Sequence, residues 1–309
     1  MLKQVLEIVD LLDSPTVNGQ QVAELLQGRG AQQVHVSRVE GTRGSTDFIK
    51  VVVPGTQGKS RGGQNPTLGV IGQLGGIGAR PEMIGLVSDA DGAIAALALA
   101  LKLTDMQARG ELLLGDVIVT TQICPYAPTL PHDPVPFMNS PVDVTVMNAY
   151  QVDSEMDAIL SIDTTKGNRI INQRGIAISP TVKEGMILQV SDDVLNAMEI
   201  VTGRRPVTFP VTMADITPYG NGLHHLNSIF QPASATSAPL IAVAITTETV
   251  VPGCATCASH EVDIAAAAQL SLQVAKEFGA NRCKFYDQEQ FALMGKLYGP
   301  SPLVGTPRA

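Results

Sequence analysis

The sequence predicts an α/β fold, more specifically a three-layer α/β/α sandwich with a mixed, mostly parallel sheet. Two observations predict it. Segments with the apolar spacing of helices alternate with short apolar strands along the 309 residues. In addition, residues 67–125 run from a strand through a long apolar helix into a second strand, which is the unit that builds parallel sheets. Because buried parallel strands need cover on both faces, we expect helices on each side of the sheet.

Two helices and two strands are predicted before the central strand. Apolar residues recur at helical spacing in two stretches, and Gly28 ends the second of them. Two strand-like stretches follow, the first of which alternates apolar and polar residues. The predicted elements are helices at residues 1–13 and 17–27, and strands at residues 33–40, 48–53 and 68–71.

A proline-rich stretch, residues 126–142, interrupts this pattern after the central unit. Its prolines predict irregular structure, either a rigid surface turn or a flap over the site that carries His132 and Asp133. The alternation then resumes, and Ser191 with the two acids after it predicts the start of a helix. The later elements are strands at residues 157–163, 175–178, 207–209 and 239–246, and helices at residues 191–202, 262–278 and 288–297.

Composition and charge narrow the class of protein. Apolar residues make up 44% and charged residues 16%, which is typical of a dense globular protein and predicts a homo-oligomer whose contacts cover part of the surface. The net charge of −8 argues against nucleic acid or an anionic membrane as partner. No apolar run predicts a membrane span or a signal peptide. Four cysteines in a chain of this size predict no disulfide framework, so we expect a reducing cytoplasm.

Two motifs suggest cofactors, and neither is complete. The glycine-rich loop at residues 72–78 lacks the G-x-G-x-x-G spacing, so no nucleotide cofactor is expected. Cys254, Cys257 and His260 have the spacing of half a zinc site, but no second pair follows. Small residues packed in a tight loop explain this segment more simply, although His260 lies just before a helix, where ligands and bases are common.

Polar residues stand where the predicted strands end. Gln73 follows the central strand, and Cys124 ends the next one. Asp89 and Asp91 precede an almost uncharged helix, and either helix capping or a binding site explains them. Asp163 ends a buried strand, so its carboxylate needs a cation, a metal or backbone donors as partner.

In this order, the residues resemble the co-catalytic zinc exopeptidases, the clan of glutamyl-type aminopeptidases, aminoacylases and carboxypeptidase G. The clan has His-x-Asp, Asp-x-x-Gly, Glu-Glu, Asp and His at successive site positions. The matching positions here are Gln73, Asp89, Ile123 with Cys124, Asp163 and His260. The segments SIDTTKGN, DITPYGNG and VPGCATCASH resemble more closely a bacterial family of unknown function whose metal ligands are degenerate.

The resemblance covers residues 1–280 and implies a zinc-aminopeptidase-like fold. Because Gln73 and Asp89 are close in sequence, it implies a single catalytic-type domain over residues 1–300 without an inserted lid domain, followed by a tail at residues 301–309. Ile123 replaces the carboxylate that serves as general base in the clan. An ordinary two-zinc peptidase is therefore not expected.

The resemblance also implies the residues of an altered site. One divalent metal ion, zinc or manganese, is expected on ligands drawn from Asp89, Asp163, His260 and Cys124. The alternative is a Cys124 nucleophile with His260 or His132 as base. The predicted substrate-binding residues are Gln73, Asp215, Asn221 and His224.

Three functions remain open from the sequence. The first is a hydrolase acting on a small amino-acid derivative, an amide or cyclic amide, at this degenerate site. The second is a non-catalytic protein that binds a small metabolite or serves as an oligomeric scaffold. The third is a cofactor-free racemase with two thiols, Cys124 and Cys254, on opposite faces of the substrate carbon.

Overall fold

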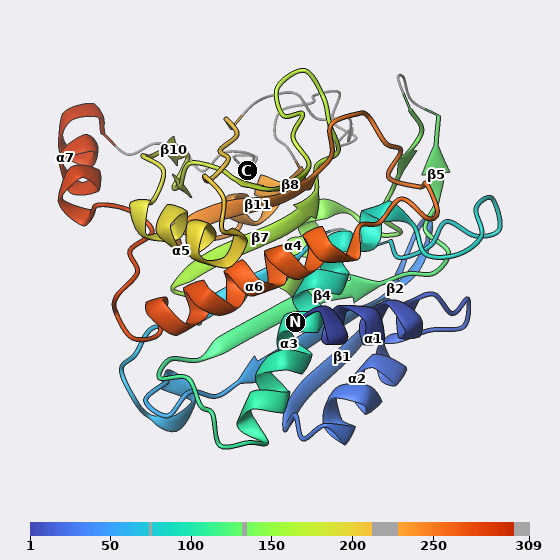
Figure 1. The fold of residues 1–309 in the computed structure, drawn as a ribbon, viewed down its shortest axis with the longest axis horizontal. Helices are drawn as coiled ribbons and strands as arrows, with labels where there is room; N and C mark the ends of the chain where they lie inside the picture. The colour runs from blue at the N-terminus through green and yellow to red at the C-terminus, as the bar shows by residue number, and fades with distance from the viewer. Residues whose placement is uncertain (74–75, 132–134, 212–227, 300–309) are drawn as a thin grey trace.

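The computed structural model describes residues 1–73, 76–131, 135–211 and 228–299 (Figure 1). The α-helices are α1 (Leu2–Leu12), α2 (Gly19–Gly28), α3 (Asp91–Gln107), α4 (Val144–Gln151), α5 (Asp192–Thr202), α6 (Glu261–Phe278) and α7 (Gln288–Tyr298). The strands are β1 (Gln33–Gly41), β2 (Gly44–Val53), β3 (Leu68–Gly72), β4 (Val117–Ile123), β5 (Thr129–Leu130), β6 (Phe137–Met138), β7 (Ala158–Thr164), β8 (Gly175–Ile178), β9 (Val182–Lys183), β10 (Met186–Ile187) and β11 (Leu240–Thr246). The short 3-10 helices are η1 (Lys59–Arg61), η2 (Ser88–Ala90) and η3 (Ser228–Ser234).

One mixed sheet forms the centre, in the order β1-β2-β4-β3-β7-β11-β9-β10, with β8 also paired to β11. The four central strands, β4, β3, β7 and β11, are parallel. The pairings outside them are antiparallel, so the prediction of a mostly parallel sheet is wrong outside the centre. Short hairpins add several of the outer strands, and a two-residue turn joins only antiparallel strands. In the β9–β10 hairpin the turn residues Glu184 and Gly185 have φ of 49° and 77°.

Helices flank both faces of this sheet. On the first face α1, α2, α3, α5 and α6 share one large apolar core with the sheet. On the second face the described residues contribute α4 and η3, which pack on smaller apolar clusters. The predicted α/β fold with a mixed sheet and flanking helices is therefore confirmed. No helix in the described ranges is long and apolar enough to cross a membrane.

Local sequence explains where several helices begin. The side chain of Asn18 accepts a hydrogen bond from the N–H of Gln21, and the Gln21 side chain returns one to Asn18, so α2 starts with a capping box. At α5 the hydroxyl of Ser191 accepts from the N–H of Val194, as the sequence predicted. These caps satisfy backbone donors that a helix leaves unpaired in its first turn.

Helix α3 is the central element of the first face and is buried on nearly all sides. Its second residue, Gly92, touches the ends of two strands. A Cβ at this position would lie 1.9 Å from the carbonyl oxygen of Gln73 and 2.5 Å from that of Ile162. Only glycine fits such a contact. This contact fixes the first residue of α3, Asp91, at the ends of β3 and β7.

Three local features differ from the prediction. Helix α4 was not predicted. The proline-rich stretch at residues 126–142 contains an antiparallel pair, β5–β6, although irregular structure was expected there. The prolines flank the paired residues, where no ladder donor is lost. The predicted strand at residues 207–209 is reduced to a single bridge between Thr208 and Ile178.

Candidate functional site

Three polar side chains stand side by side at the carboxyl ends of the central strands. The parallel register places Gln73, just after β3, beside Gln122 on β4 and beside Asp163 on β7. The N–H of Gln73 continues the ladder by donating to the carbonyl oxygen of Ile162 at 2.8 Å. Adjacent strands lie about 4.8 Å apart, so the three side chains are direct neighbours. We call Gln122, Gln73 and Asp163 the polar row.

The polar row faces α4 and η3. The hydroxyl of Thr120, two residues before Gln122, donates to the carbonyl oxygen of Gln151 in α4 at 2.8 Å. The hydroxyl of Ser228 in η3 donates to Asp163 at 2.8 Å. Side chains two residues apart on a strand share a face, so the whole row lies on the second face of the sheet.

The two amides of the row are buried and have no partner in the part of the chain that the structure describes. Gln73 is 1% exposed and Gln122 is fully buried. Neither the Oε1 nor the Nε2 atom of either side chain has a hydrogen-bond partner among the described residues. A buried polar group without a partner costs roughly 1–3 kcal/mol, so native proteins rarely keep such groups without a use for them.

Further unpaired polar atoms surround the row. The hydroxyl of Ser161, two residues before Asp163 on β7, lacks a partner within the described chain, and so does that of Thr246 at the end of β11. The side chain of Gln151 at the end of α4 is likewise buried and unpaired there. Donors and acceptors therefore gather on the second face of the sheet, at the carboxyl ends of its central strands. Open α/β sheets bind ligands at this end of their strands.

Asp163 has the partners that its burial requires. It is 1% exposed. Its Oδ1 accepts from the backbone N–H of Thr164 at 2.7 Å, and its Oδ2 accepts from Ser228. The expectation that this carboxylate needs a partner is thus confirmed, with a backbone donor and a hydroxyl in that role.

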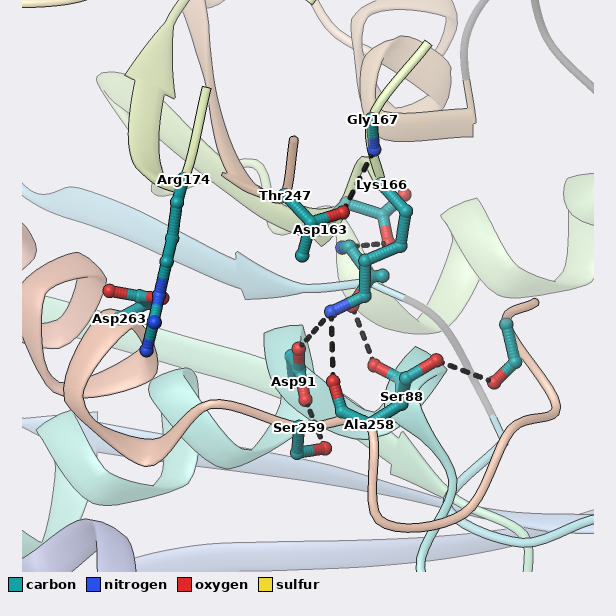
Figure 2. Close-up of polar contacts among 12 residues, drawn as sticks. Ser88, Asp91, Asp163, Lys166, Gly167, Arg174, Thr247, Ala258, Ser259 and Asp263 are labelled. Atoms are coloured by element: carbon teal, nitrogen blue, oxygen red, sulfur yellow. Dashed lines mark hydrogen bonds and ion pairs between the residues drawn. The ribbon is translucent and has the colours of Figure 1, made fainter. Parts of the chain in front are cut away.

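A second cluster forms at the start of α3, and it joins three loops (Figure 2). Lys166, from the loop after β7, places its Nζ 3.0 Å from Oδ2 of Asp91. Ser259, from the loop after β11, donates from Oγ to Oδ1 of Asp91 at 2.5 Å. Lys166 also lies 3.5 Å from the carbonyl oxygen of Ala258. We call Asp91, Lys166 and Ser259 the Asp91 cluster.

The members of the Asp91 cluster differ in exposure. Asp91 is fully buried, and the Lys166 side chain is 5% exposed. Ser259 and the neighbouring His260 are partly exposed. Burial raises the pKa of Asp91, although Lys166, the Ser259 hydroxyl and His260 all act in the opposite direction. A buried carboxyl group with a raised pKa at a strand edge is typical of a functional site.

The loop after β11 also fixes the segment that carries Asp89. The hydroxyl of Ser88 donates to the carbonyl oxygen of Pro252 at 2.8 Å, and the N–H of Asp89 donates to that of Gly253 at 2.9 Å. The hydroxyl of Thr164 donates to the Ser88 carbonyl oxygen at 2.7 Å. Asp89 is buried, with Gly253 packed against its carboxylate. The loops after β3, β7 and β11 are therefore held together around the start of α3.

The predicted nucleophile, Cys124, lies in an apolar cluster. It is 2% exposed and shares that cluster with Met138 and Cys254. Burial raises the pKa of the Cys124 thiol to about 11, and burial also raises the pKa of Cys254. Both thiols are therefore protonated at neutral pH. A protonated Cys124 is disfavoured as a nucleophile and as a metal ligand, because both roles need the thiolate. The two-thiol racemase is disfavoured for the same reason, since one of its two thiols must be ionised.

The predicted metal ligands do not form a metal site within the described chain. No three His, Cys, Asp or Glu side chains there are placed to hold one ion, and the expected ligands Asp89, Asp163, His260 and Cys124 are all among those residues. The divalent metal stays a prediction. The other expected site residues, His132, Asp215, Asn221 and His224, lie outside the described residues.

The sequence interpretation considered Asp91 together with Asp89 but gave it no site role, and it missed Lys166 and Ser259. Asp91 lies two residues after Asp89, Lys166 three after Asp163, and Ser259 directly before His260. Each was passed over in favour of the neighbour that fits the exopeptidase pattern. A lysine in a loop that follows a buried strand ending in aspartate was the available indication.

A hollow of about 210 Å³ lies elsewhere, between β1, β2 and α4. The ion pair between Lys50 and Asp153 and the stacked rings of Phe48 and Tyr150, 4.7 Å apart, occupy its wall. These groups are paired with one another, so the hollow is less suited to bind a ligand than the polar row.

The described elements form an α/β fold, and comparison with solved structures shows that this fold is aminopeptidase-like. The crystal structure of the Legionella pneumophila LapA aminopeptidase matches with a TM-score of 0.52 and 8% identity, covering 90% of this chain and 71% of that one. A second LapA crystal structure matches with a TM-score of 0.49 and 9% identity, covering 90% and 72%. At 8% identity the first of these likenesses shows the fold alone.

The chain belongs to the family described as "Protein of unknown function (DUF1177)", whose model matches residues 37–307. No curated protein matches it. The sequence interpretation had expected both an aminopeptidase-like fold and a family of unknown function, and both are confirmed.

Proposed function

We propose that this protein is a hydrolase that binds a small amino-acid derivative, an amide or cyclic amide, at the polar row and cleaves it at the carboxyl edge of the sheet. The observation that carries the proposal is the pair of buried amides, Gln73 and Gln122, that have no partner among the described residues. Gln73 was expected to bind substrate from the sequence, and Gln122 joins it.

The chemistry of the row favours an amide as ligand. Each glutamine offers an N–H₂ donor and a carbonyl acceptor, and a carboxamide or lactam presents the complementary acceptor and donor. Asp163 adds a carboxylate at one end of the row, which suits an amino group. A site built from buried hydrogen-bonding groups rejects analogues that leave those groups unpaired, so it discriminates strongly between amides and isosteric hydrocarbons.

The proposed hydrolase differs from an ordinary two-zinc peptidase. The ends of β3 and β4 carry glutamine amides, which neither accept a proton at neutral pH nor bear charge. Because the predicted ligands do not converge within the described chain, no step of the proposal relies on a metal ion. Elemental analysis of protein purified without chelator tests the predicted zinc or manganese separately.

Ligand-induced thermal stabilisation tests the proposal. Amino-acid amides and lactams are expected to raise the melting temperature of the wild-type protein, and the matching free acids and hydrocarbons are not. Product release is then followed for each stabilising compound. Absence of stabilisation by any amide or lactam, together with absence of turnover, would contradict the proposal.

A non-catalytic binding protein is the second candidate. The observation that favours it is the chemistry of the strand ends, where Gln73, Gln122 and a protonated Cys124 offer no general base. This candidate predicts tight binding of an amide without turnover by pure protein. Measurable turnover that co-purifies with the protein excludes it.

A further inference from the structure

The Asp91 cluster has the parts of an acyl-transfer site that uses a hydroxyl. Ser259 is its nucleophilic group, and its Oγ lies 2.5 Å from a carboxylate oxygen of Asp91. Ser259 is partly exposed, whereas Asp91 is fully buried behind it. A hydroxyl that a substrate can reach, hydrogen-bonded to a buried base, is the arrangement that activates a serine.

Lys166 fixes the orientation of the base. Its Nζ lies 3.0 Å from Oδ2 of Asp91, so the two carboxylate oxygens have different partners and Oδ1 is left facing Ser259. His260 is the other titratable group whose charge acts on Asp91.

Backbone donors lie directly after Ser259. Helix α6 begins at Glu261, and its N-cap residue, His260, makes no side-chain cap. The N–H groups of His260, Glu261 and Val262 donate no hydrogen bond to any other residue in the described ranges. The first N–H groups of a helix of 18 residues favour negative charge, which is what an oxyanion requires.

We propose that Ser259 is the catalytic nucleophile of this protein, that Asp91 is its general base, and that Lys166 is a positioning residue. The inference rests on the proposed hydrolase function. Ser259 Oγ bonds to the amide carbonyl carbon while its proton passes to Oδ1 of Asp91, and the carbonyl electron pair becomes an oxyanion at the N–H groups of residues 260–262. The oxyanion then reforms the carbonyl as the C–N bond breaks.

Water is the only reagent that the cycle needs besides the amide substrate. The leaving amine takes the proton from Asp91. Water attacks the resulting ester of Ser259, gives one proton to Asp91, and expels the serine alkoxide, which recovers a proton from Asp91. The products are the carboxylic acid and the amine, and the three residues return to their starting states.

An activated ester tests the inference independently of the natural substrate. The full-length protein is incubated with p-nitrophenyl acetate, and the acetylated residue is identified by peptide mass spectrometry. We expect a single acetyl group on Ser259 in the wild type and none at this position in Ser259→Ala. In Asp91→Asn the acetylation rate is expected to fall at least about a hundredfold.

A conservative substitution separates a positioning from a merely structural role of Lys166. Lys166→Met removes the ammonium group beside Oδ2 of Asp91, so the acetylation rate of Ser259 is expected to fall. Lys166→Arg keeps a cation beside that oxygen and is expected to restore most of the rate. An unchanged rate in folded Lys166→Met would contradict the positioning role.

Ser271→Ala is the matched control, because Ser271 is a buried serine of α6, the helix that follows Ser259, and its hydroxyl bonds within that helix. It is expected to react as the wild type does. Acetylation of another residue, or an unchanged rate in folded Ser259→Ala and Asp91→Asn, overturns the inference. In that event the proposed function is still supported if amides raise the melting temperature of the protein. Conversely, absence of both stabilisation and turnover with every amide and lactam defeats that function even where Ser259 is acetylated.

Discussion

At the scale of residues, the molecule contains two kinds of buried polar group. The Asp91 cluster is fully paired, with each carboxylate oxygen bonded to a different partner. Gln73 and Gln122 are unpaired within the described chain and therefore cost stability. The paired groups hold three loops together, whereas the unpaired amides of the row keep donors and acceptors that another molecule can complete.

Thiol reactivity tests the conclusion that Cys124 is not a nucleophile. Cys257 is exposed, and the other three cysteines are buried. Burial raises the pKa of Cys124 to about 11 and that of Cys283 to about 12. In the native protein at neutral pH we expect Cys257 alone to react quickly with a thiol reagent, as judged by mass spectrometry. Rapid modification of Cys124 would restore the cysteine mechanism.

At the scale of elements, hydrophobic periodicity predicted most helices and the four central strands. It failed where local patterns are short. Helix α4, eight residues long, is too brief to show a clear apolar repeat. The hairpin β9–β10 depends on a turn with positive φ at Glu184. Glutamate is not a residue that indicates such a turn in a sequence. Hence the parallel centre was expected correctly and the antiparallel flanks were not.

Part of the candidate site was predicted, because local patterns in the sequence reveal strand ends but not how strands pair. Strand ends identified Gln73 and Asp163, because a polar residue after an apolar strand is visible in the sequence. Their common face could not be predicted, since it follows from the register of β3, β4 and β7. The contact between Asp91 and Lys166 joins residues 75 positions apart, and no local pattern encodes it.

Asp105 joins three helices and gives a prediction for pH. Its carboxylate accepts from Gln4 in α1 at 2.9 Å and from Arg29, after α2, at 2.9 Å. Burial raises the pKa of Asp105, but these hydrogen bonds and the charge of Arg29 outweigh it, and the net shift is downward from 3.8. A lowered pKa contributes stability above the unfolded value, and this stability is lost as pH falls through the folded value.

Asp105→Asn is therefore expected to unfold more easily than the wild type at pH 7, by about 1 kcal/mol or less because the group is partly solvated. The difference is expected to shrink below pH 3.8, where the wild-type carboxylate also gains its proton. Urea unfolding at a series of pH values measures it. A difference that grows in acid would contradict the assigned pairing.

At the scale of the whole molecule, α7 lies at the margin of the protein, where Phe291 contacts Tyr286 and Lys183 (Figure 1). None of its described residues is buried, and Leu293, Leu297 and Tyr298 are more than half exposed. A helix of 11 residues is marginal in water without packing. The homo-oligomer expected from the apolar composition would cover such a helix.

Sedimentation of the wild type and of Leu297→Glu tests this. We expect an oligomer for the wild type and a smaller species for the variant, because a buried charge in an apolar contact is costly. Leu112→Glu, which alters an exposed leucine away from α7, is the control and should sediment as the wild type does. A monomeric wild type would show that α7 needs no partner.

The central claim is that the polar row exists to bind an amide, and paired measurements of stability and binding test it most directly. Gln73→Met and Gln122→Met keep the length of the side chain and remove its unpaired amide. Each is expected to raise the free energy of unfolding by roughly 1–3 kcal/mol and to weaken amide binding at least about tenfold. Gln4→Met, which loses a hydrogen bond to Asp105, should instead lower stability and leave binding unchanged. Loss of stability in both row variants, with amide binding intact, would contradict the claim.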